Sequence, residues 1–257
     1  MIAARNIEYL SPPAQVSMAD QWFEIASLDH FWIQRRFAVL QKLCGETISE
    51  AREMAEIGCG HGLLQRQIEI AYNRAVTGFD LNNCALNQNL STGSRICCYD
   101  ILQMDQAFRH KFDLVFLFDV LEHIADEDVF LKALAFHLAP RGKLLINVPA
   151  GQLLFSKYDE SAGHVRRYSI QTLSESGRRS GLQIEKWSYW GMPLLPILAL
   201  RKLWLAGMHD RRRIVNSGFG SRTSGINKML GTISRCEMIP QKLFGTSLMA
   251  ILHDSNK

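Results

Sequence analysis

Short apolar runs alternate with amphipathic segments along the middle of the chain. Residues 53–57 (EMAEI) form a compact apolar run that ends at a group of glycines, and residues 63–73 carry apolar side chains at helical spacing. The first segment therefore predicts a β-strand and the second an α-helix.

The same alternation continues through residue 149. The pattern predicts a helix over 126–138 and four further strands, at 75–80, 94–100, 111–120 and 140–149. The run 111–120 is apolar almost throughout, which is typical of a strand covered on both faces. A repeated strand–helix order of this kind predicts an α/β fold, with a parallel sheet between two layers of helices.

The flanking regions complete a single predicted domain over 1–257. Residues 181–190 and 245–254 predict two more strands, and residues 17–43 predict one or two helices. The expected organisation is an N-terminal helical cap (1–50), a sheet core (51–190 and 245–257), and a mostly helical insertion or lid (191–244).

Composition and charge narrow the class of protein. Of 257 residues, 47% are hydrophobic and 21% charged, and 29 basic against 25 acidic side chains give a formal charge of +4. Such a small excess does not argue for a nucleic-acid partner. The six cysteines form no C-x-x-C pair, and the N-terminus lacks a secretory apolar core, so we expect a reduced, cytoplasmic protein.

The stretch AEIGCGHG (55–62) carries three glycines at alternate positions after the first core strand. Glycines at such a turn let a ligand lie against bare backbone at the carboxyl edge of the sheet. The lysine of a phosphate-binding P-loop is missing, and Gly62 comes one residue too early for the dinucleotide fingerprint. A plain strand-to-helix turn is the structural alternative.

Two aspartates favour a ligand-binding turn over a purely structural one. Asp80 ends the second core strand, where a carboxylate accepts hydrogen bonds from ribose hydroxyls, and Asp100 ends the third, where it accepts from an adenine amino group. The ends of successive parallel strands line one crevice. Glu56 would repel a pyrophosphate but suits a cation, so the sequence predicts a pocket for an adenosine without a phosphate chain.

At this point the chain resembles the class I S-adenosylmethionine-dependent methyltransferases. The resemblance rests on the ordered segments EIGCGHG (56–62), GFDLN (78–82), CYDI (98–101), FDLVFLFDVLEHIAD (112–126) and LAPRGKLLINVP (138–149). It implies S-adenosylmethionine as cofactor and a Rossmann-like, doubly wound, seven-stranded and mostly parallel sheet with an antiparallel last strand. The cofactor-binding positions it implies are Glu56, Gly58, Cys59, Gly60, Gly62, Asp80, Leu81, Asp100, Ile101, Asp119 and Val120.

A looser resemblance reaches both ends of the chain. DHFWIQRRF (29–37) and DESAGHVRRYS (159–169) look like segments of bacterial small-molecule and saccharide-associated methyltransferases. This implies a small-molecule or glycan acceptor, methylated on oxygen rather than on nitrogen or carbon. It also implies that the first segment closes over the cofactor, with Arg36 near the cofactor's carboxylate.

The loop after the fifth core strand carries the candidate acceptor residues. His164 is the predicted general base, because imidazole takes up a proton near neutral pH. Arg167 and Tyr168 are predicted to bind the acceptor, and His123 to line its pocket. Alternatively, the loop residues only cap the next helix and satisfy one another. No metal is expected, since the sequence does not nominate enough ligands around Glu122 and His123.

The most apolar part of the chain is the predicted lid. Residues 192–213 combine a wide apolar face with several arginines and lysines, which suits peripheral contact with a membrane. A lid over an apolar pocket and a dimer interface suit this pattern equally well. A helix buried against the sheet is the simplest interpretation and the one that the pattern favours. The oligomeric state is not predicted.

Two other functions stay open from the residues alone. One is a methyltransferase-like module that binds the cofactor without turnover, and the other is an NAD-dependent oxidoreductase, which Gly62 and Asp100 disfavour. A nucleic-acid acceptor is not expected, because FDVLEH (118–123) lacks the Asn/Asp-Pro-Pro-aromatic motif of many base-modifying enzymes.

Overall fold

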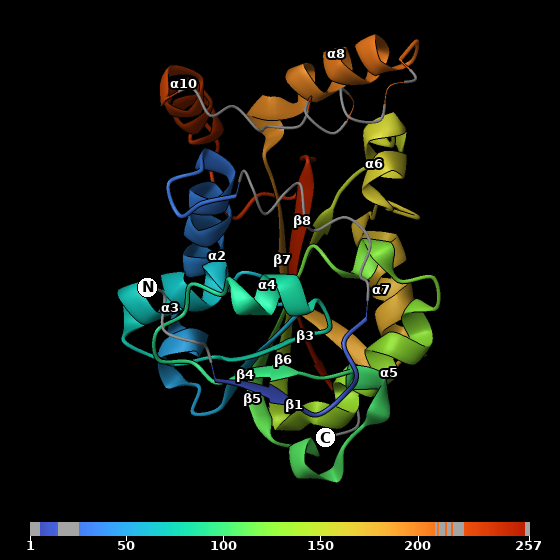
Figure 1. Cartoon of the computed structure of the whole chain (residues 1–257). Coiled ribbons are helices and arrows are strands. Elements are labelled where there is room, and N and C mark those ends of the chain that lie inside the picture. Colours follow the sequence, from blue (N-terminus) through green and yellow to red (C-terminus); the bar gives the residue numbers. More distant parts are fainter. Residues whose placement is uncertain are drawn as a thin grey trace.

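The computed structural model describes residues 6–14, 26–208, 210, 214, 217 and 224–254. An eight-stranded sheet runs through the molecule in the order β1-β4-β3-β2-β5-β6-β8-β7 (Figure 1). The strands are β1 (Ile7–Tyr9), β2 (Met54–Ile57), β3 (Thr77–Asp80), β4 (Ile96–Cys98), β5 (Phe112–Phe118), β6 (Leu138–Pro149), β7 (Leu182–Trp190) and β8 (Ser247–Asp254).

The predicted mostly parallel, doubly wound sheet is confirmed, with one strand more than expected. All seven predicted strands form, and β8 runs antiparallel to both β6 and β7. The additional strand, β1, lies at the sheet edge and pairs in parallel with β4. It has only three residues, which is too short for an alternation of apolar and polar positions to reveal it.

Helices precede, connect and follow the strands. They are α2 (Phe31–Glu50), α3 (Leu63–Tyr72), α4 (Asn83–Asn87), α5 (Glu127–His137), α6 (Lys157–Ala162), α7 (Ile170–Arg179), α8 (Leu195–Leu205) and α10 (Ser224–Ser234). The segment 1–50 is therefore not wholly helical as predicted, because β1 belongs to the sheet. Residues 17–25 of the predicted N-terminal helices lie outside the described part of the chain.

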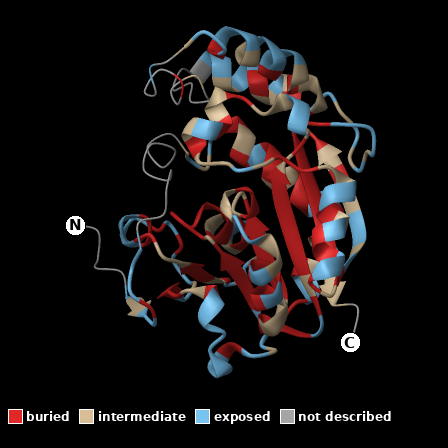
Figure 2. Ribbon diagram, turned by 90° about the vertical axis from the view of Figure 1, so that its right-hand side faces the viewer, coloured by how far each residue is buried: buried red, intermediate tan, exposed pale blue. Residues whose placement is uncertain are grey.

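Both faces of the sheet are covered, and its central strands are buried, whereas the edge strands β1 and β7 are partly exposed (Figure 2). Neighbouring β5 residues point to opposite sides: Phe116 packs in a cluster with Leu40 of α2 and Leu64 of α3. Leu117 packs in a second cluster, which includes Leu131 of α5. This two-sided burial explains why the parallel strands read as apolar runs rather than as alternating patterns.

A third, smaller cluster joins the helical insertion to the body. Phe31, at the start of α2, packs with Leu194 and Leu198 next to and within α8, and with Leu230 of α10. These contacts hold α8 and α10 together beyond the carboxyl ends of the parallel strands (Figure 1). The insertion thus lies where a doubly wound sheet binds its ligands.

Candidate active site

A cavity of about 390 Å³ opens at the carboxyl edge of the sheet. It lies where the strand order reverses between β2 and β5, the position at which open α/β sheets bind ligands. Strand ends line one side of it, and residues from the 158–167 segment and from α8 line the other. Nearly all the predicted cofactor positions line this cavity, namely Glu56, Gly58, Cys59, Gly60, Asp80, Leu81, Asp100, Ile101, Asp119 and Val120.

The glycine turn needs its glycines for geometric reasons. Gly58 has a φ of +73°, and a Cβ atom there would lie 2.4 Å from Cγ2 of Val120. Gly62 begins α3 with a φ of +69°, and its Cβ would lie 2.3 Å from Oδ1 of Asn89. Gly62 is not among the lining residues, so its place is explained by local packing rather than by ligand contact.

The two strand-end aspartates share the cavity, as the sequence predicts. Asp80 accepts hydrogen bonds from the backbone N–H of Gly60 at 2.7 Å and of Asn82 at 2.8 Å. Asp100 accepts one from the N–H of Leu102 at 3.0 Å. Burial raises the pKa of Asp80, while the backbone donors oppose that rise. Both carboxylates are therefore fixed in direction and reach a common ligand space.

Glu56 is the most unusual group on the cofactor side. Its residue is only 4% exposed, and its Oε2 has no hydrogen-bond partner among the described residues. Burial raises the pKa of this carboxyl group to about 8, although Arg36 acts in the opposite direction. A buried carboxyl oxygen without a partner fits a cationic ligand, because such a ligand would stabilise the carboxylate.

Asp119 is held in place at the end of β5. It adopts a φ of +56° and accepts hydrogen bonds from Arg36 Nη1 and from Asn147 Nδ2, the latter at 2.7 Å. Asn147 in turn accepts a hydrogen bond from the indole of Trp190 at 2.9 Å. Through Arg36, α2 is tied to the cavity wall beside the predicted cofactor positions.

The candidate base, His164, is oriented by a buried carboxylate. Its Nδ1 lies 3.0 Å from Oδ1 of Asp159, which also accepts a hydrogen bond from Nε of Arg167 at 2.8 Å. Burial alone would raise the pKa of Asp159, but the hydrogen bonds from His164 and the nearby Arg167 lower it to about 2. Asp159 is therefore ionised at neutral pH. Because it binds Nε of Arg167, only the remaining N–H groups of that guanidinium are left for an acceptor.

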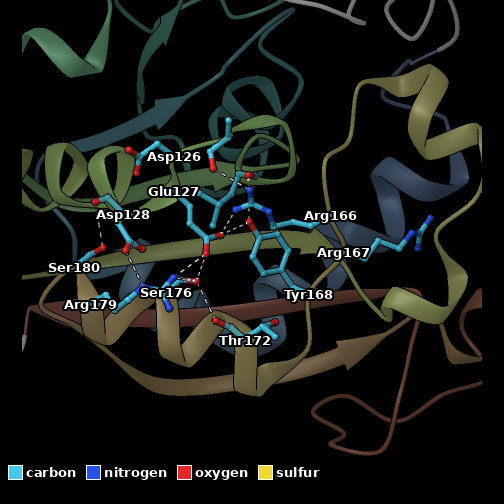
Figure 3. A network of polar contacts seen from close by, with 12 residues as sticks. Asp126, Glu127, Asp128, Arg166, Arg167, Tyr168, Thr172, Ser176, Arg179 and Ser180 are labelled. Carbon is cyan, nitrogen blue, oxygen red and sulfur yellow. Dashed lines mark hydrogen bonds and ion pairs between the residues drawn. The ribbon is translucent and has the colours of Figure 1, made fainter.

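Tyr168 does not lie in the cavity, unlike the prediction for it. Its ring is 1% exposed, and its hydroxyl donates to Oε2 of Glu127 at 2.8 Å. Figure 3 shows Tyr168 turned toward Glu127, while Arg167 points away from that network. Glu127 also binds Arg166, Arg179 and Ser176. Tyr168 thus fastens the acceptor loop to α5 and α7 and does not line the site.

The loop also brings three potential metal ligands together. Ligand atoms of Glu122, His123 and His164 all lie within 4.8 Å of one another, and all three residues line the cavity. Burial and the neighbouring His164 lower the pKa of His123 to about 4. The sequence nominated only the first two of these residues, because the third is about 40 positions further along the chain.

Several lining residues were not predicted, and the polar ones include Asn82, Tyr158 and Arg201. Asn82 follows Asp80 by two positions, a spacing that offered a signal for it at the strand end. Tyr158 and Arg201 come from α6 and α8, with the guanidinium carbon of Arg201 4.3 Å from the centre of the Tyr158 ring. No local motif marks these two, because only the folding of α8 over the loop brings them to the cavity.

Comparison with known proteins assigns the fold and site to a family. The family described as "Methyltransferase domain" matches residues 8–186, which is more than half of the chain. This chain belongs to that family. The matched range runs from β1 into β7 and includes every predicted cofactor position, so the predicted class I methyltransferase assignment is confirmed.

Relatives with curated names are more distant. The chain is 25% identical over 168 residues to tocopherol O-methyltransferase of Arabidopsis thaliana, covering 60% of this chain and 47% of the relative. It is 32% identical over 110 residues to a ubiquinone biosynthesis O-methyltransferase of Caulobacter sp., covering 40% and 42%. The chain therefore spans less than half the length of these relatives.

Solved structures share the fold. A SAM-dependent methyltransferase from Archaeoglobus fulgidus superposes with a TM-score of 0.54 at 16% identity, covering 85% of this chain and 93% of that one. Phosphoethanolamine N-methyltransferase 2 of Haemonchus contortus, in complex with S-adenosyl-L-methionine, gives 0.54 at 18% identity, covering 88% and 56%.

The cofactor of this domain is S-adenosylmethionine, and the residues present fit it. Bound, it supplies a methyl group on a positively charged sulfur. The buried Oε2 of Glu56, which has no partner among the described residues, suits that charge. The glycine turn leaves room along the backbone, and Asp80 and Asp100 offer acceptors at two strand ends. The matching of each residue to one part of the cofactor belongs to the proposal below.

Proposed function

We propose that this protein methylates an oxygen atom of a small, lipophilic or lipid-linked acceptor, and that it works at a membrane surface. The observation that carries the proposal is the His164–Asp159 pair beside the cofactor positions. Support comes from the two curated relatives, which are O-methyltransferases named for tocopherol and for ubiquinone biosynthesis.

His164 is the proposed catalytic base. A carboxylate accepts but does not donate, so the Nδ1 of His164 carries the proton that faces Asp159, and its Nε2 keeps a free electron pair. Nε2 would remove the acceptor's hydroxyl proton as the acceptor oxygen bonds to the methyl carbon and the carbon–sulfur bond breaks, which would leave S-adenosylhomocysteine. The ionised Asp159 stabilises the imidazolium that forms, in the way that an orienting carboxylate supports a catalytic histidine.

The remaining roles follow the resemblance. Asp80 would accept hydrogen bonds from ribose hydroxyls and Asp100 from the adenine amine, while Glu56 faces the cationic part of the cofactor. His123 would form the wall of the acceptor space together with apolar residues such as Leu198 and Phe130. This apolar lining supports a lipophilic acceptor whose hydroxyl group reaches the histidines.

Helix α8 supports a membrane-facing role because it is apolar on two opposite sides. Leu198 and Leu205 are 6% and 0% exposed and face inward. Leu200, Leu203 and Trp204 are 67%, 73% and 59% exposed and face outward. An outward apolar face on a surface helix is the pattern of a peripheral membrane contact. Among the described residues, no helix is both long and apolar enough to span a membrane.

Charge separates the insertion from the rest of the chain. Residues 191–244 contain nine Lys or Arg and two Asp or Glu, whereas the other residues contain 20 and 23. The small net charge of the whole chain is therefore the sum of a basic insertion and a slightly acidic remainder. A basic, apolar surface matches a bilayer with anionic headgroups, and this favours a lipid surface over a dimer interface. Residues 209 and 211–213 of the predicted contact segment lie outside the described residues.

The cytoplasmic side of a membrane is the proposed location. All six cysteines are free, and two of them, Cys84 and Cys236, are exposed. Exposed thiols suit a reducing compartment.

A methyl-transfer assay on His164→Gln tests the proposal. Labelled S-adenosylmethionine is offered with polyprenyl phenols in anionic vesicles, and with water-soluble phenols in their absence. The wild-type protein is expected to methylate the vesicle-borne acceptors, and His164→Gln to lose about 10²–10⁴-fold in rate, the usual contribution of a general base. S-adenosylhomocysteine should bind both proteins equally.

The same assay includes a control variant and distinguishes the alternative functions. His253→Gln, on β8, changes a histidine outside the cavity and should keep full activity. Undiminished turnover by His164→Gln would remove His164 as the base. Tight S-adenosylhomocysteine binding with no methyl transfer to any acceptor would favour the non-catalytic module, and heat of binding from NAD would favour the oxidoreductase.

A further inference from the structure

We propose that Glu122, His123 and His164 form a binding site for a divalent transition-metal ion of the Zn²⁺ class. Their ligand atoms lie within 4.8 Å of one another. Three ligands at about 2.1 Å from one tetrahedral ion are about 3.4 Å apart, so the side chains would close in by about 1 Å when an ion binds. Two imidazoles and one carboxylate form a donor set that Zn²⁺ and its neighbours in the first transition row accept, with a further position left for a ligand from the cavity.

Both histidines are held in the tautomer that a metal requires. The Nδ1 of His123 lies 3.2 Å from the carbonyl oxygen of Gly163, and the Nδ1 of His164 lies 3.0 Å from Oδ1 of Asp159. Each of these partners can only accept, so each Nδ1 carries the proton and each Nε2 offers its electron pair. A histidine that donates its far N–H to a carbonyl or carboxylate is the usual arrangement at metal sites.

Glu122 supplies the second, independent observation. Its side chain is 1% exposed, and its Oε2 has no hydrogen-bond partner among the described residues. Its Oε1 is 4.0 Å from Nε2 of His164, which is too long for a hydrogen bond. A carboxyl oxygen buried without a partner is costly, and a bound cation would satisfy it.

Binding of the ion has a consequence that rests on the proposed function. The electron pair on Nε2 of His164 serves either the ion or the acceptor's proton, but not both. Zn²⁺ is therefore expected to inhibit the base-dependent methyl transfer in proportion to its occupancy. The binding itself requires only the three side chains.

The test is metal binding to the full chain, without a histidine tag, after treatment with a chelator. Zn²⁺ is titrated by calorimetry, and Co²⁺ is titrated while its visible absorption is recorded. We expect one ion per chain and a Co²⁺ spectrum of low coordination number. Glu122→Gln, His123→Gln and His164→Gln should each weaken binding by more than about 100-fold, since loss of a mere supporting residue costs about 10–100-fold.

Controls separate this site from chance binding and from misfolding. His253→Gln should bind Zn²⁺ like the wild type, and every variant should bind S-adenosylhomocysteine. Asp159→Asn alters the Nδ1 partner of His164 and keeps all three ligands, and it should weaken Zn²⁺ binding by about 10–100-fold. Absence of binding, or binding that the three substitutions leave unchanged in folded protein, overturns the site. Zn²⁺ that binds there without slowing methyl transfer would instead overturn His164 as the base.

Discussion

The two sides of the cavity are built in different ways. On the cofactor side, a glycine turn and the ends of β2, β3 and β4 supply the contacts, and backbone N–H groups fix Asp80 and Asp100. On the acceptor side, side chains from a loop and from α6 and α8 supply them, and Asp159 organises His164 and Arg167. The first side follows from the sheet topology, whereas the second depends on contacts between distant side chains.

The strongest challenge to the cofactor side is Gly58→Ala. The new Cβ would lie 2.4 Å from Val120, in a backbone conformation with a φ of +73°. Strain and overpacking together should lower the free energy of unfolding by about 2–5 kcal/mol. If the turn shifts to relieve the clash, the binding free energy of S-adenosylhomocysteine should weaken by about the same amount instead. Thermal unfolding and calorimetry measure both quantities. Gly207→Ala is the control, because nothing lies within 4 Å of a Cβ there.

Asp80→Ala separates the two sides more cleanly. Loss of a buried acceptor should weaken S-adenosylhomocysteine binding by about 1–3 kcal/mol. Association with anionic vesicles should not change, since Asp80 is at the end of β3, away from the outward face of α8. Equal affinity of wild type and variant for S-adenosylhomocysteine would contradict the pocket described for the ribose.

Leu200→Asp is the matching change on the acceptor side. Leu200 is 67% exposed on α8, and inserting such a side chain into a bilayer is worth about 1.5–3 kcal/mol. Co-sedimentation with anionic vesicles should therefore fall by at least about tenfold, with no loss of cofactor affinity. Ile70→Asp is a suitable control, because Ile70 is 64% exposed and lies on α3, outside the helical insertion. Equal loss in both variants would argue against α8 as the contact.

A smaller effect concerns the protonation of Glu56. Its pKa of about 8 in the free protein means that it carries a proton at pH 7, and a cationic cofactor favours the carboxylate. Binding should therefore release up to one proton at pH 7 and almost none at pH 9. Calorimetry in buffers of different ionisation enthalpy measures this number, and Glu56→Gln should abolish it.

The same group predicts how stability depends on pH. Because the pKa of Glu56 is higher in the folded protein than its ordinary value of 4.5, the folded state binds the proton more tightly. Its contribution to stability is complete below about pH 4.5 and is lost as pH rises through about 8. Glu56→Gln should flatten the decline of the free energy of unfolding of the cofactor-free protein over that interval.

These differences also explain what the sequence could predict. Asp80 and Asp100 were identified because parallel strands place their carboxyl ends at one edge, so position in the pattern determines position in space. Arg201 and Tyr158 were missed, because their place in the cavity depends on how α8 packs over the loop. Tyr168 was assigned to the acceptor site, but the pattern of a loop does not show which way a side chain points.

The interior of the chain was easier to predict than its ends. Long apolar runs such as 111–120 predicted β5 closely, whereas β1 has three residues and depends on its pairing with β4. The third member of the proposed metal site was missed for a related reason. Glu122 and His123 are adjacent in sequence, but His164 reaches them only because the loop returns from β6 to the end of β5.

The two-sided character of α8 has a kinetic consequence. If its outward face rests in lipid, its inward face, with Leu198, borders the reaction space. A hydrophobic acceptor can then pass from the bilayer into the enzyme along one helix without entering water. Turnover would then depend on the mole fraction of acceptor in the membrane, and diluting the vesicles with buffer would leave the rate per bound enzyme unchanged.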